Sequence, residues 1–204
     1  MEIKKLSVIV PAYNEEATIQ TILTTLTAVK LVNDIAMEII VVNDCSRDKT
    51  AERLQAFIDA HPNTDIRAFH HEVNKGKGAA LHTGIANATG DYTIVQDADL
   101  EYDPWEFNVL LKPVVERNAD VVYGSRFMGG KPHRILFYWH SIGNKFLTGL
   151  SNMFSNLNLT DMETCYKLVR TSIIQSIKLK EKRFGFEPEL TQKLGKIKNI
   201  AIYE

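Results

Sequence analysis

The sequence lacks the features that mark several large classes of protein. Its 204 residues include only two cysteines, Cys45 and Cys165, too few for a disulfide framework or a zinc site and typical of free thiols in a reducing compartment. The formal net charge of −1 excludes the basic excess of a nucleic-acid binder. No stretch approaches the ~18 apolar residues of a membrane span, and the apolar run ending at Pro11 is too short for a signal peptide. We therefore expect a cytoplasmic domain, which could reach the cytoplasmic face of a membrane through its surface or a segment outside this sequence.

Short apolar runs and amphipathic stretches alternate along the first half of the chain. The apolar runs predict strands and the periodic stretches predict helices. The expected strands are 6–10, 37–42, 66–69, 92–96 and 121–123, and the expected helices are 15–29, 51–60, 79–88 and 104–115. This order is typical of an α/β fold with a Rossmann-like, mostly parallel sheet flanked by helices. Ser46 is the expected N-cap of the helix at 51–60.

The second half of the chain is less regular. We expect a helix at 137–153, a turn and strand at 160–169, a helix at 186–194 and a last strand at 197–203. Because neither an internal repeat nor a linker interrupts the pattern, residues 1–204 are interpreted as one domain. The chain stops directly after its last expected strand, which is typical of a domain truncated at its C-terminus.

Four polar clusters follow directly after predicted strands. They are 11–15, 43–46, 97–101 and 124–126. The carboxyl ends of parallel strands meet at one edge of a sheet, and ligands bind at that edge. A single cluster of this kind is an ordinary capped turn, but four of them at one edge indicate a ligand site.

The segment Asp97-Ala98-Asp99-Leu100-Glu101 gives the most specific chemical prediction. Two carboxylates two residues apart on a tight turn, with Glu101 as a third, can converge on one hard cation. Mg²⁺ and Mn²⁺ take such oxygen ligands and keep positions for diphosphate oxygens. We therefore predict a Mg²⁺ or Mn²⁺ site at Asp97, Asp99 and Glu101. The alternative is a helix N-cap in a solvated acidic loop.

Several further residues suggest a nucleotide at the same edge. Asp44 follows the second strand, from which an acidic residue binds a ribose or base in dinucleotide folds. The loop Lys75-Gly76-Lys77-Gly78 places backbone N–H groups and a cation at a helix N-terminus, although such a loop is more often a plain turn. Tyr13 could stack on a base or pack at the sheet edge. His70 and His71 have no partner at metal-ligand spacing, so both are expected at the surface.

Together these motifs resemble the family-2 glycosyltransferases of the A-type fold, and within them the dolichyl-phosphate mannosyltransferase-like polyprenyl-phosphate sugar synthases. The resemblance covers nearly the whole chain and rests on VIVPAYNE (8–15), NKGKGAA (74–80), DADLE (97–101), GSRF (124–127), DMETCYK (161–167) and FGFEPEL (184–190). It implies one glycosyltransferase catalytic domain over 1–204. It also implies transfer, with inversion, of a hexosyl unit from a UDP- or GDP-linked sugar to an acceptor. One departure is Cys45, which stands where the family usually has glycine and suggests a different loop backbone.

The resemblance implies roles for individual residues. Nucleotide-sugar binding is implied for Pro11, Tyr13, Glu15, Val42, Asp44, Asp97 and Ala98, to which the glycine loop adds Lys75. Asp99 and Glu101 are implied to hold the metal, and Arg126 to face the sugar phosphate or an acceptor phosphate. The candidates for the catalytic step are Asp99, Arg126, Asp161 and Glu163.

The nature of the acceptor decides the remaining chemistry. A sugar hydroxyl needs a general base, for which Asp161 and Glu163 are both candidates. A polyprenyl phosphate is already largely anionic at pH 7 and needs cations instead. The cations available for an acceptor phosphate are Arg126, Lys131 and Arg134, with His133 between them. This cluster favours a lipid-phosphate acceptor.

Three other interpretations stay open. The nearest is the same donor with a carbohydrate acceptor, as in cell-surface polysaccharide synthesis. A sugar-phosphate nucleotidyltransferase would need a long glycine-rich phosphate loop, which the segment 11–15 is not. A non-catalytic nucleotide-sugar-binding module is the third. The aromatic run Phe137-Tyr138-Trp139 could touch a bilayer, but we expect at least two of the three to pack in the core.

Overall fold

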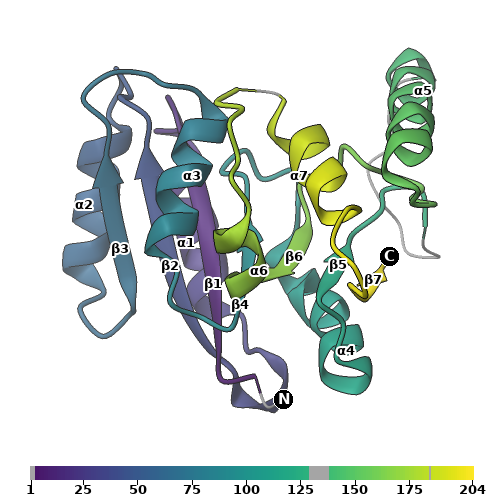
Figure 1. The fold of residues 1–204 in the computed structure, drawn as a ribbon. Helices are drawn as coiled ribbons and strands as arrows, with labels where there is room; N and C mark the ends of the chain where they lie inside the picture. Colours follow the sequence, from purple (N-terminus) through teal and green to yellow (C-terminus); the bar gives the residue numbers. More distant parts are fainter. Residues whose placement is uncertain (1–2, 129–137, 184) are drawn as a thin grey trace.

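The computed structural model describes residues 3–128, 138–183 and 185–204. Within these ranges, seven strands form one sheet in the order β3-β2-β1-β4-β6-β5-β7 (Figure 1). The strands are β1 (Lys5–Ala12), β2 (Ala36–Asn43), β3 (Ile66–His70), β4 (Tyr92–Val95), β5 (Val121–Tyr123), β6 (Lys167–Arg170) and β7 (Ile202–Tyr203). The predicted α/β fold is confirmed. The expected strand at 197–203 is reduced to its last two residues.

The strand directions decide which loops meet. Parallel pairing joins β3, β2, β1 and β4, so the carboxyl ends of these strands lie at one edge of the sheet. β6 runs antiparallel to both β4 and β5. Because β6 is reversed, the segment 161–166, which precedes it, reaches the edge where β4 and β5 end. This segment therefore joins the site although it comes before its strand.

Helices cover both faces of the sheet. They are α1 (Ile19–Ala28), α2 (Thr50–Ala60), α3 (Lys77–Asn87), α4 (Phe107–Arg117), α5 (Tyr138–Ser155), α6 (Thr171–Ser176) and α7 (Phe186–Leu194), with 3-10 turns η1 (Val32–Asp34) and η2 (Pro104–Glu106). α1, α2 and α4 share one apolar core with the sheet, while α3, α6 and α7 pack on the opposite face. The short α6 was not expected, because six residues are too few to reveal a helical period.

The start of α2 differs from the prediction for a physical reason. Ser46 does not cap α2, which begins at Thr50. The N-cap residue is Lys49, whose side chain makes no cap hydrogen bond, and Asp48 before it accepts the Thr50 backbone N–H at 3.0 Å. The Ser46 hydroxyl instead accepts the Asn14 backbone N–H at 3.0 Å, which joins the loops that follow β1 and β2. The predicted cap is therefore wrong, and the serine holds together two loops of the site.

Helix α5 lies on the opposite side of the molecule from α2 and has an unusual distribution of polarity (Figure 1). Its buried side chains are polar: Asn144, Thr148, Ser151 and Ser155. Its exposed large apolar side chains are Tyr138, Trp139, Ile142, Phe146, Leu147, Leu150, Met153 and Phe154. This helix therefore turns its polar face inward and its apolar face outward, the reverse of an ordinary surface helix.

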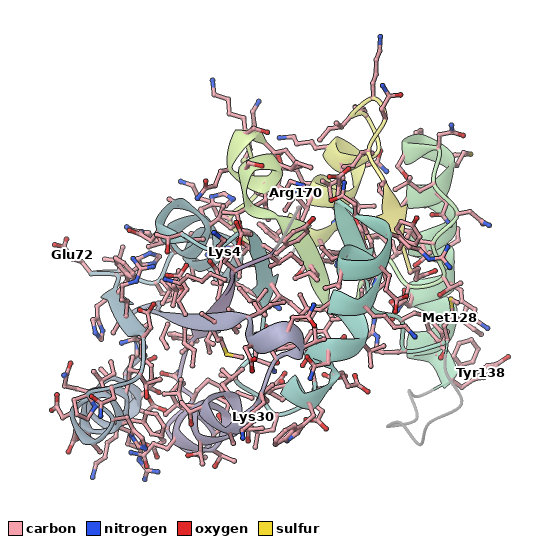
Figure 2. The ribbon with its side chains drawn as sticks, turned by 90° about the horizontal axis from the view of Figure 1, so that it is seen from below. Lys4, Lys30, Glu72, Met128, Tyr138 and Arg170 are labelled. Atoms are coloured by element: carbon pink, nitrogen blue, oxygen red, sulfur yellow. The ribbon has the colours of Figure 1, made fainter. Side chains whose placement is uncertain are left out.

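The aromatic residues at the start of α5 correct one expectation. Tyr138 and Trp139 are 70% and 76% exposed, so the prediction that at least two of the three aromatics pack in the core is wrong. Phe137 lies outside the described residues. Figure 2 shows Tyr138 at the margin of the molecule, at the end of α5. Among the described residues, no helix is long and apolar enough to cross a bilayer.

Candidate active site

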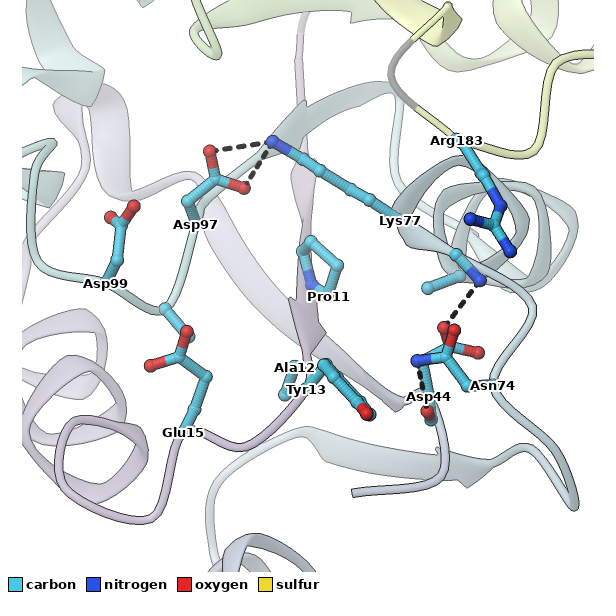
Figure 3. Close-up of a pocket in the computed structure, with 13 residues that line it drawn as sticks. Pro11, Ala12, Tyr13, Glu15, Asp44, Asn74, Lys77, Asp97, Asp99 and Arg183 are labelled. Atoms are coloured by element: carbon cyan, nitrogen blue, oxygen red, sulfur yellow. Dashed lines mark hydrogen bonds and ion pairs between the residues drawn. The ribbon is translucent and has the colours of Figure 1, made fainter. Parts of the chain in front are cut away.

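A cavity of about 430 Å³ opens at the sheet edge where β1, β2 and β4 end (Figure 3). Its lining residues are Pro11, Ala12, Tyr13, Glu15, Asp44, Asn74, Gly76, Lys77, Ala80, Asp97, Ala98, Asp99 and Arg183. They include seven residues predicted from the sequence to bind the donor or the metal. The parallel strands thus bring together three polar clusters that are far apart in the chain, as expected from the topology.

Asp44 shapes the cavity wall through hydrogen bonds to the neighbouring loop. Its carboxylate accepts the backbone N–H groups of Lys75 at 2.9 Å and Gly76 at 2.7 Å. His71 Nδ1 lies 2.7 Å from the same carboxylate, and its Nε2 lies 2.9 Å from Thr83 Oγ1. A carboxylate has about four acceptor positions, so Asp44 retains room for about one more hydrogen bond. The expected surface position is wrong for His71, whose side chain is only 8% exposed, and correct for His70.

The glycine loop directs a different lysine toward the cavity than the one predicted. Gly76 has φ of +94°, a conformation in which a side chain would be strained, and α3 begins at the next residue. This turn places Lys77 in the cavity wall, whereas Lys75 is exposed and is not a lining residue. The predicted role of Lys75 is therefore limited to its backbone N–H, which Asp44 accepts.

Lys77 joins two acidic residues at the cavity. Its Nζ lies 2.8 Å from both carboxylate oxygens of Asp97 (Figure 3). The same Nζ lies 3.7 Å from Glu187 on α7. Burial by itself would lower the pKa of Lys77, but the acidic groups around it raise that pKa above its usual value. Lys77 is therefore positively charged at neutral pH and compensates Asp97.

The carboxylates at the cavity fit a divalent metal only in part. Asp97 and Asp99 both line the cavity, but Asp97 is already paired with Lys77. Glu101 is not a lining residue, and its backbone N–H donates to Asp99 at 3.0 Å. Within the described ranges, no group of three His, Cys, Asp or Glu side chains is arranged to hold a metal. Mg²⁺ is commonly held by one or two carboxylates together with substrate phosphates, so Asp99 is the protein ligand that fits best.

A second polar centre lies where β5 ends. Arg126 Nε donates to Asp161 Oδ2 at 2.7 Å and its Nη2 donates to Oδ1 at 2.8 Å. Asn144 Nδ2 of α5 adds a hydrogen bond to Asp161 Oδ1 at 2.9 Å. Asp161 has 0% exposure, and burial alone would raise its pKa, but the hydrogen bonds from Arg126 and Asn144 hold that pKa below its usual value. Asp161 is therefore an ionised, buried partner that orients Arg126.

The pKa of Glu163, two residues after Asp161, is shifted in the opposite direction. Burial, followed by the negative charge of Glu187, raises its pKa above the usual value. Its side chain is half-buried and lines a second cavity, whereas Asp161 has no accessible surface. A raised pKa in a cleft is typical of a group that can exchange a proton near neutral pH. Of the two residues predicted as general-base candidates, Glu163 is the one with an accessible side chain.

Besides Lys75, Glu101 and the residues around Arg126, three further predicted site residues do not line the donor cavity or lie outside the described residues. Val42 has 0% exposure and packs with Ile40 and Ala80 beneath the cavity, so its side chain does not line it. The cations Lys131 and Arg134 lie outside the described residues, as does His133 between them.

The sequence analysis missed Asn74 and Arg183, which line the cavity, and Glu187, which pairs with Lys77. Arg183 is delivered by a segment that packs on the glycine loop, where a Cβ on Gly76 would lie 2.6 Å from the Lys182 carbonyl oxygen. The only available signal for Arg183 was the charged segment 180–183, which contains three basic residues and Glu181 and precedes the 184–190 motif. Glu187 lies inside that motif, but its spacing did not reveal a partner 110 residues earlier.

The fold agrees with the comparison with known families. Residues 7–178 match the model of Glycosyl transferase family 2. The chain belongs to glycosyl transferase family 2. The expected resemblance to polyprenyl-phosphate sugar synthases is also confirmed by the relatives of this family-2 chain.

Two relatives illustrate the similarity. The family-2 chain is 26% identical over 199 residues to the dolichol-phosphate mannosyltransferase of Pyrococcus furiosus, covering 97% of this chain and 54% of that protein. It is 30% identical over 202 residues to the undecaprenyl-phosphate 4-deoxy-4-formamido-L-arabinose transferase of Photorhabdus laumondii, covering 98% and 59% respectively. The chain thus spans little more than half the length of these relatives.

Among solved structures, the glucosyl-3-phosphoglycerate synthase of Mycobacterium tuberculosis in complex with Mn²⁺, UDP and phosphoglyceric acid has the same fold. Its TM-score is 0.73 at 22% sequence identity, covering 98% of this chain and 67% of that chain. The likeness shows that the two chains share a fold.

Proposed function

We propose that this family-2 glycosyltransferase moves a hexosyl unit, with inversion, from a UDP- or GDP-linked sugar to a polyprenyl phosphate at the cytoplasmic face of a membrane. We infer that residues 1–204 form the catalytic domain for this reaction. The names of the relatives support the acceptor class, and the Mycobacterium complex with UDP supports the donor class.

The donor would occupy the cavity at the ends of β1, β2 and β4. Tyr13, 42% exposed at the cavity wall, is placed to stack on the base, and Asp44 is near the position expected for a ribose or base contact. Asp97 and Ala98 would contact the donor, with Lys77 and Arg183 as additional cations for its phosphates. Lys and Arg are the usual partners of phosphate oxygens.

We infer that Mg²⁺ or Mn²⁺ takes part, with Asp99 as its protein ligand. When bound, such an ion neutralises the charge that develops on a departing nucleoside diphosphate. The Mn²⁺ and Mg²⁺ complexes of the Mycobacterium synthase support this inference. Asp97 keeps its pairing with Lys77 in this arrangement, and Glu101 lies within the electrostatic reach of Arg126, whose charged form it stabilises.

The single observation that carries the acceptor assignment is the pairing of Arg126 with Asp161. The pairing uses two of the five guanidinium N–H donors and holds the arginine in a defined orientation. An oriented cation serves an acceptor phosphate, which needs charge compensation and no base. Asp161, ionised and inaccessible, would be a positioning residue in this reaction. Lys131 and Arg134 remain proposed contributors to the same phosphate site.

A carbohydrate acceptor is the second candidate, because Glu163 could serve as its general base. The raised pKa of Glu163 and its place in a cavity wall favour this alternative. A hydroxyl would then lose its proton to Glu163 while it attacks the anomeric carbon.

Peripheral contact with a bilayer would bring the enzyme to a lipid acceptor. The outer face of α5, formed by Tyr138, Trp139, Ile142 and Phe146, is exposed and apolar. α5 contains no acidic residue and carries Lys145, and the preceding segment 131–134 is basic. Aromatic and basic side chains of this kind favour the interface of an anionic membrane.

The test is a nucleoside diphosphate release assay with UDP- and GDP-sugars, Mg²⁺ or Mn²⁺, and a short-chain polyprenyl phosphate. We expect release to be stimulated by the lipid phosphate and abolished by EDTA. Asp99→Ala should lower kcat by about 100-fold or more, the scale of a lost transition-state charge interaction. The control Glu106→Ala removes an exposed acid outside the cavity and should leave kcat unchanged. Stimulation by an oligosaccharide in place of the lipid phosphate would favour the second candidate instead.

A further inference from the structure

A second cavity lies between α5 and α7, separate from the donor cavity. Its volume is about 480 Å³, and it shares no lining residue with the donor cavity. The apolar part of the wall consists of Leu147, Leu150 and Phe154 of α5, Met162 before β6 and Pro188 of α7. The polar part consists of Ser151, Glu163, Gln192 and the exposed Lys196. We call this space the α5–α7 groove.

The α5–α7 groove begins beside the anchor of Arg126. Asp161, which holds Arg126, is followed directly by Met162 and Glu163 in the groove wall. On α5, Asn144 donates to Asp161 at 2.9 Å, and Leu147 lies about one helical turn further along. From Asn144 to the far end of the wall at Phe154, α5 extends about 15 Å. Along α5, the residue that bonds to the anchor of Arg126 is therefore followed directly by the residues of the apolar wall.

The chemistry of the two ends points to an amphiphile. Arg126 offers guanidinium donors to an anion, while the side chains of α5 that line the groove offer contact to hydrocarbon. Glu163 is the one acidic residue in the groove wall as described, and burial together with Glu187 raises its pKa, which favours its neutral form beside an apolar ligand. A free sugar would gain little from the apolar residues of this wall, and the Gln192 amide already donates to Ser151.

We propose that the α5–α7 groove binds the first isoprene units of an amphiphilic phosphate whose headgroup lies at Arg126. The proposal rests on the proposed function, since it assigns a path to the hydrocarbon of the acceptor. It also accounts for the reversed polarity of α5. The inward side chain of Asn144 holds Asp161 in place, and the edge of α5 that faces α7 contacts the hydrocarbon.

The test measures binding of farnesyl phosphate to the 204-residue chain by calorimetry, without donor and without metal and below the micelle concentration. Wild-type protein should bind farnesyl phosphate at least about tenfold more tightly than inorganic phosphate, because several apolar groups are buried. Leu150→Gln and Phe154→Ser should each weaken farnesyl phosphate binding by about tenfold. The matched control Met153→Gln, on the same helix and 67% exposed but outside the groove, should leave it unchanged.

Both groove variants are expected to fold, since Leu150 and Phe154 are 38% and 70% exposed, and thermal unfolding checks this. Equal affinity for farnesyl phosphate and inorganic phosphate would overturn the proposal. Equal weakening by Met153→Gln would also overturn it, by indicating non-specific adsorption to α5. Sedimentation checks one other occupant. If the wild-type chain is a dimer and the groove variants are monomers, a second copy of the chain occupies the groove, and the proposal of a lipid is wrong. Failure of the proposed function would be seen in a different assay, because no acceptor would then stimulate the release of nucleoside diphosphate.

Discussion

Two buried carboxylates, Glu38 and Asp161, have similar surroundings but lie at opposite ends of the strands of the sheet. Glu38 is 1% exposed and bonds to Arg67 at 2.6 Å and to the Thr89 backbone N–H at 2.7 Å. It ties β2 to β3 and to the turn before β4, at the edge away from the site. Asp161 is 0% exposed and also bonds to an arginine, but that arginine lies at the site edge. The same interaction joins strands in one place and holds an arginine at the site edge in the other.

The largest expected effect comes from breaking the Asp161 centre. Asp161→Ala should destabilise the protein by about 3–5 kcal/mol, because it leaves the half-buried charge of Arg126 without its partner. Asp161→Asn should cost less stability but still reduce transfer to a phosphate acceptor, since Arg126 loses its charged orienting partner. Urea unfolding and the release assay measure the two effects separately.

A double variant separates the contribution of this pair to stability from its contribution to activity. The double variant Arg126→Met with Asp161→Leu should recover most of the stability, because no unpaired charge remains, but not the activity. Donor binding, measured with UDP alone, should persist in all of these variants. Wild-type transfer to a phosphate acceptor by the double variant would contradict the role assigned to Arg126.

A smaller effect, confined to stability, is expected from the pH dependence of Glu38. Burial alone would raise its pKa, but hydrogen bonds from Ser7 and Thr89 lower that pKa from 4.5 to about 2. The unfolded state therefore takes up a proton before the folded state does. The stabilisation is complete above about pH 4.5 and is lost as the pH falls through about 2, with a magnitude on the order of 3 kcal/mol.

Urea unfolding between pH 6 and pH 2.5 measures this contribution of Glu38. Glu38→Gln should be less stable at neutral pH and should show a flatter decline in acid. An unchanged decline in Glu38→Gln would assign the acid sensitivity to other carboxylates, Asp161 among them.

The smallest of the three effects concerns the outer face of α5. Trp139→Ser combined with Phe146→Ser should weaken binding to anionic vesicles by about tenfold, the scale of burying two apolar side chains in part. Vesicle sedimentation without acceptor measures this. The control Val109→Ser changes an apolar residue on α4 that is 59% exposed, compared with 76% for Trp139 and 66% for Phe146, and should have no effect. Equal binding by the Trp139 and Phe146 variant would show that this face does not contact the bilayer.

Local patterns predicted the donor side of the molecule well. The strands before 11–15, 43–46 and 97–101 form as expected, and their parallel pairing places the polar residues that follow at one cavity. Even the unusual Cys45 keeps the backbone in the left-handed region, with φ of 59°, where glycine is favoured. That conformation costs roughly 1 kcal/mol for a non-glycine residue. The loop geometry is therefore compatible with cysteine, at a modest loss of stability.

The sequence by itself determined the α/β order, the family and the cavity carboxylates, because these follow from short apolar runs and from the loops that directly follow them. Only the tertiary structure decided the direction of β6, which brings Asp161 to Arg126, and the turn at Gly76, which favours Lys77 over Lys75. It also decided which face of α5 is buried. Periodicity tells which residues share a helix face, but whether that face meets the core depends on partners from distant parts of the chain. On α5 those partners are polar, so its apolar face is left outside.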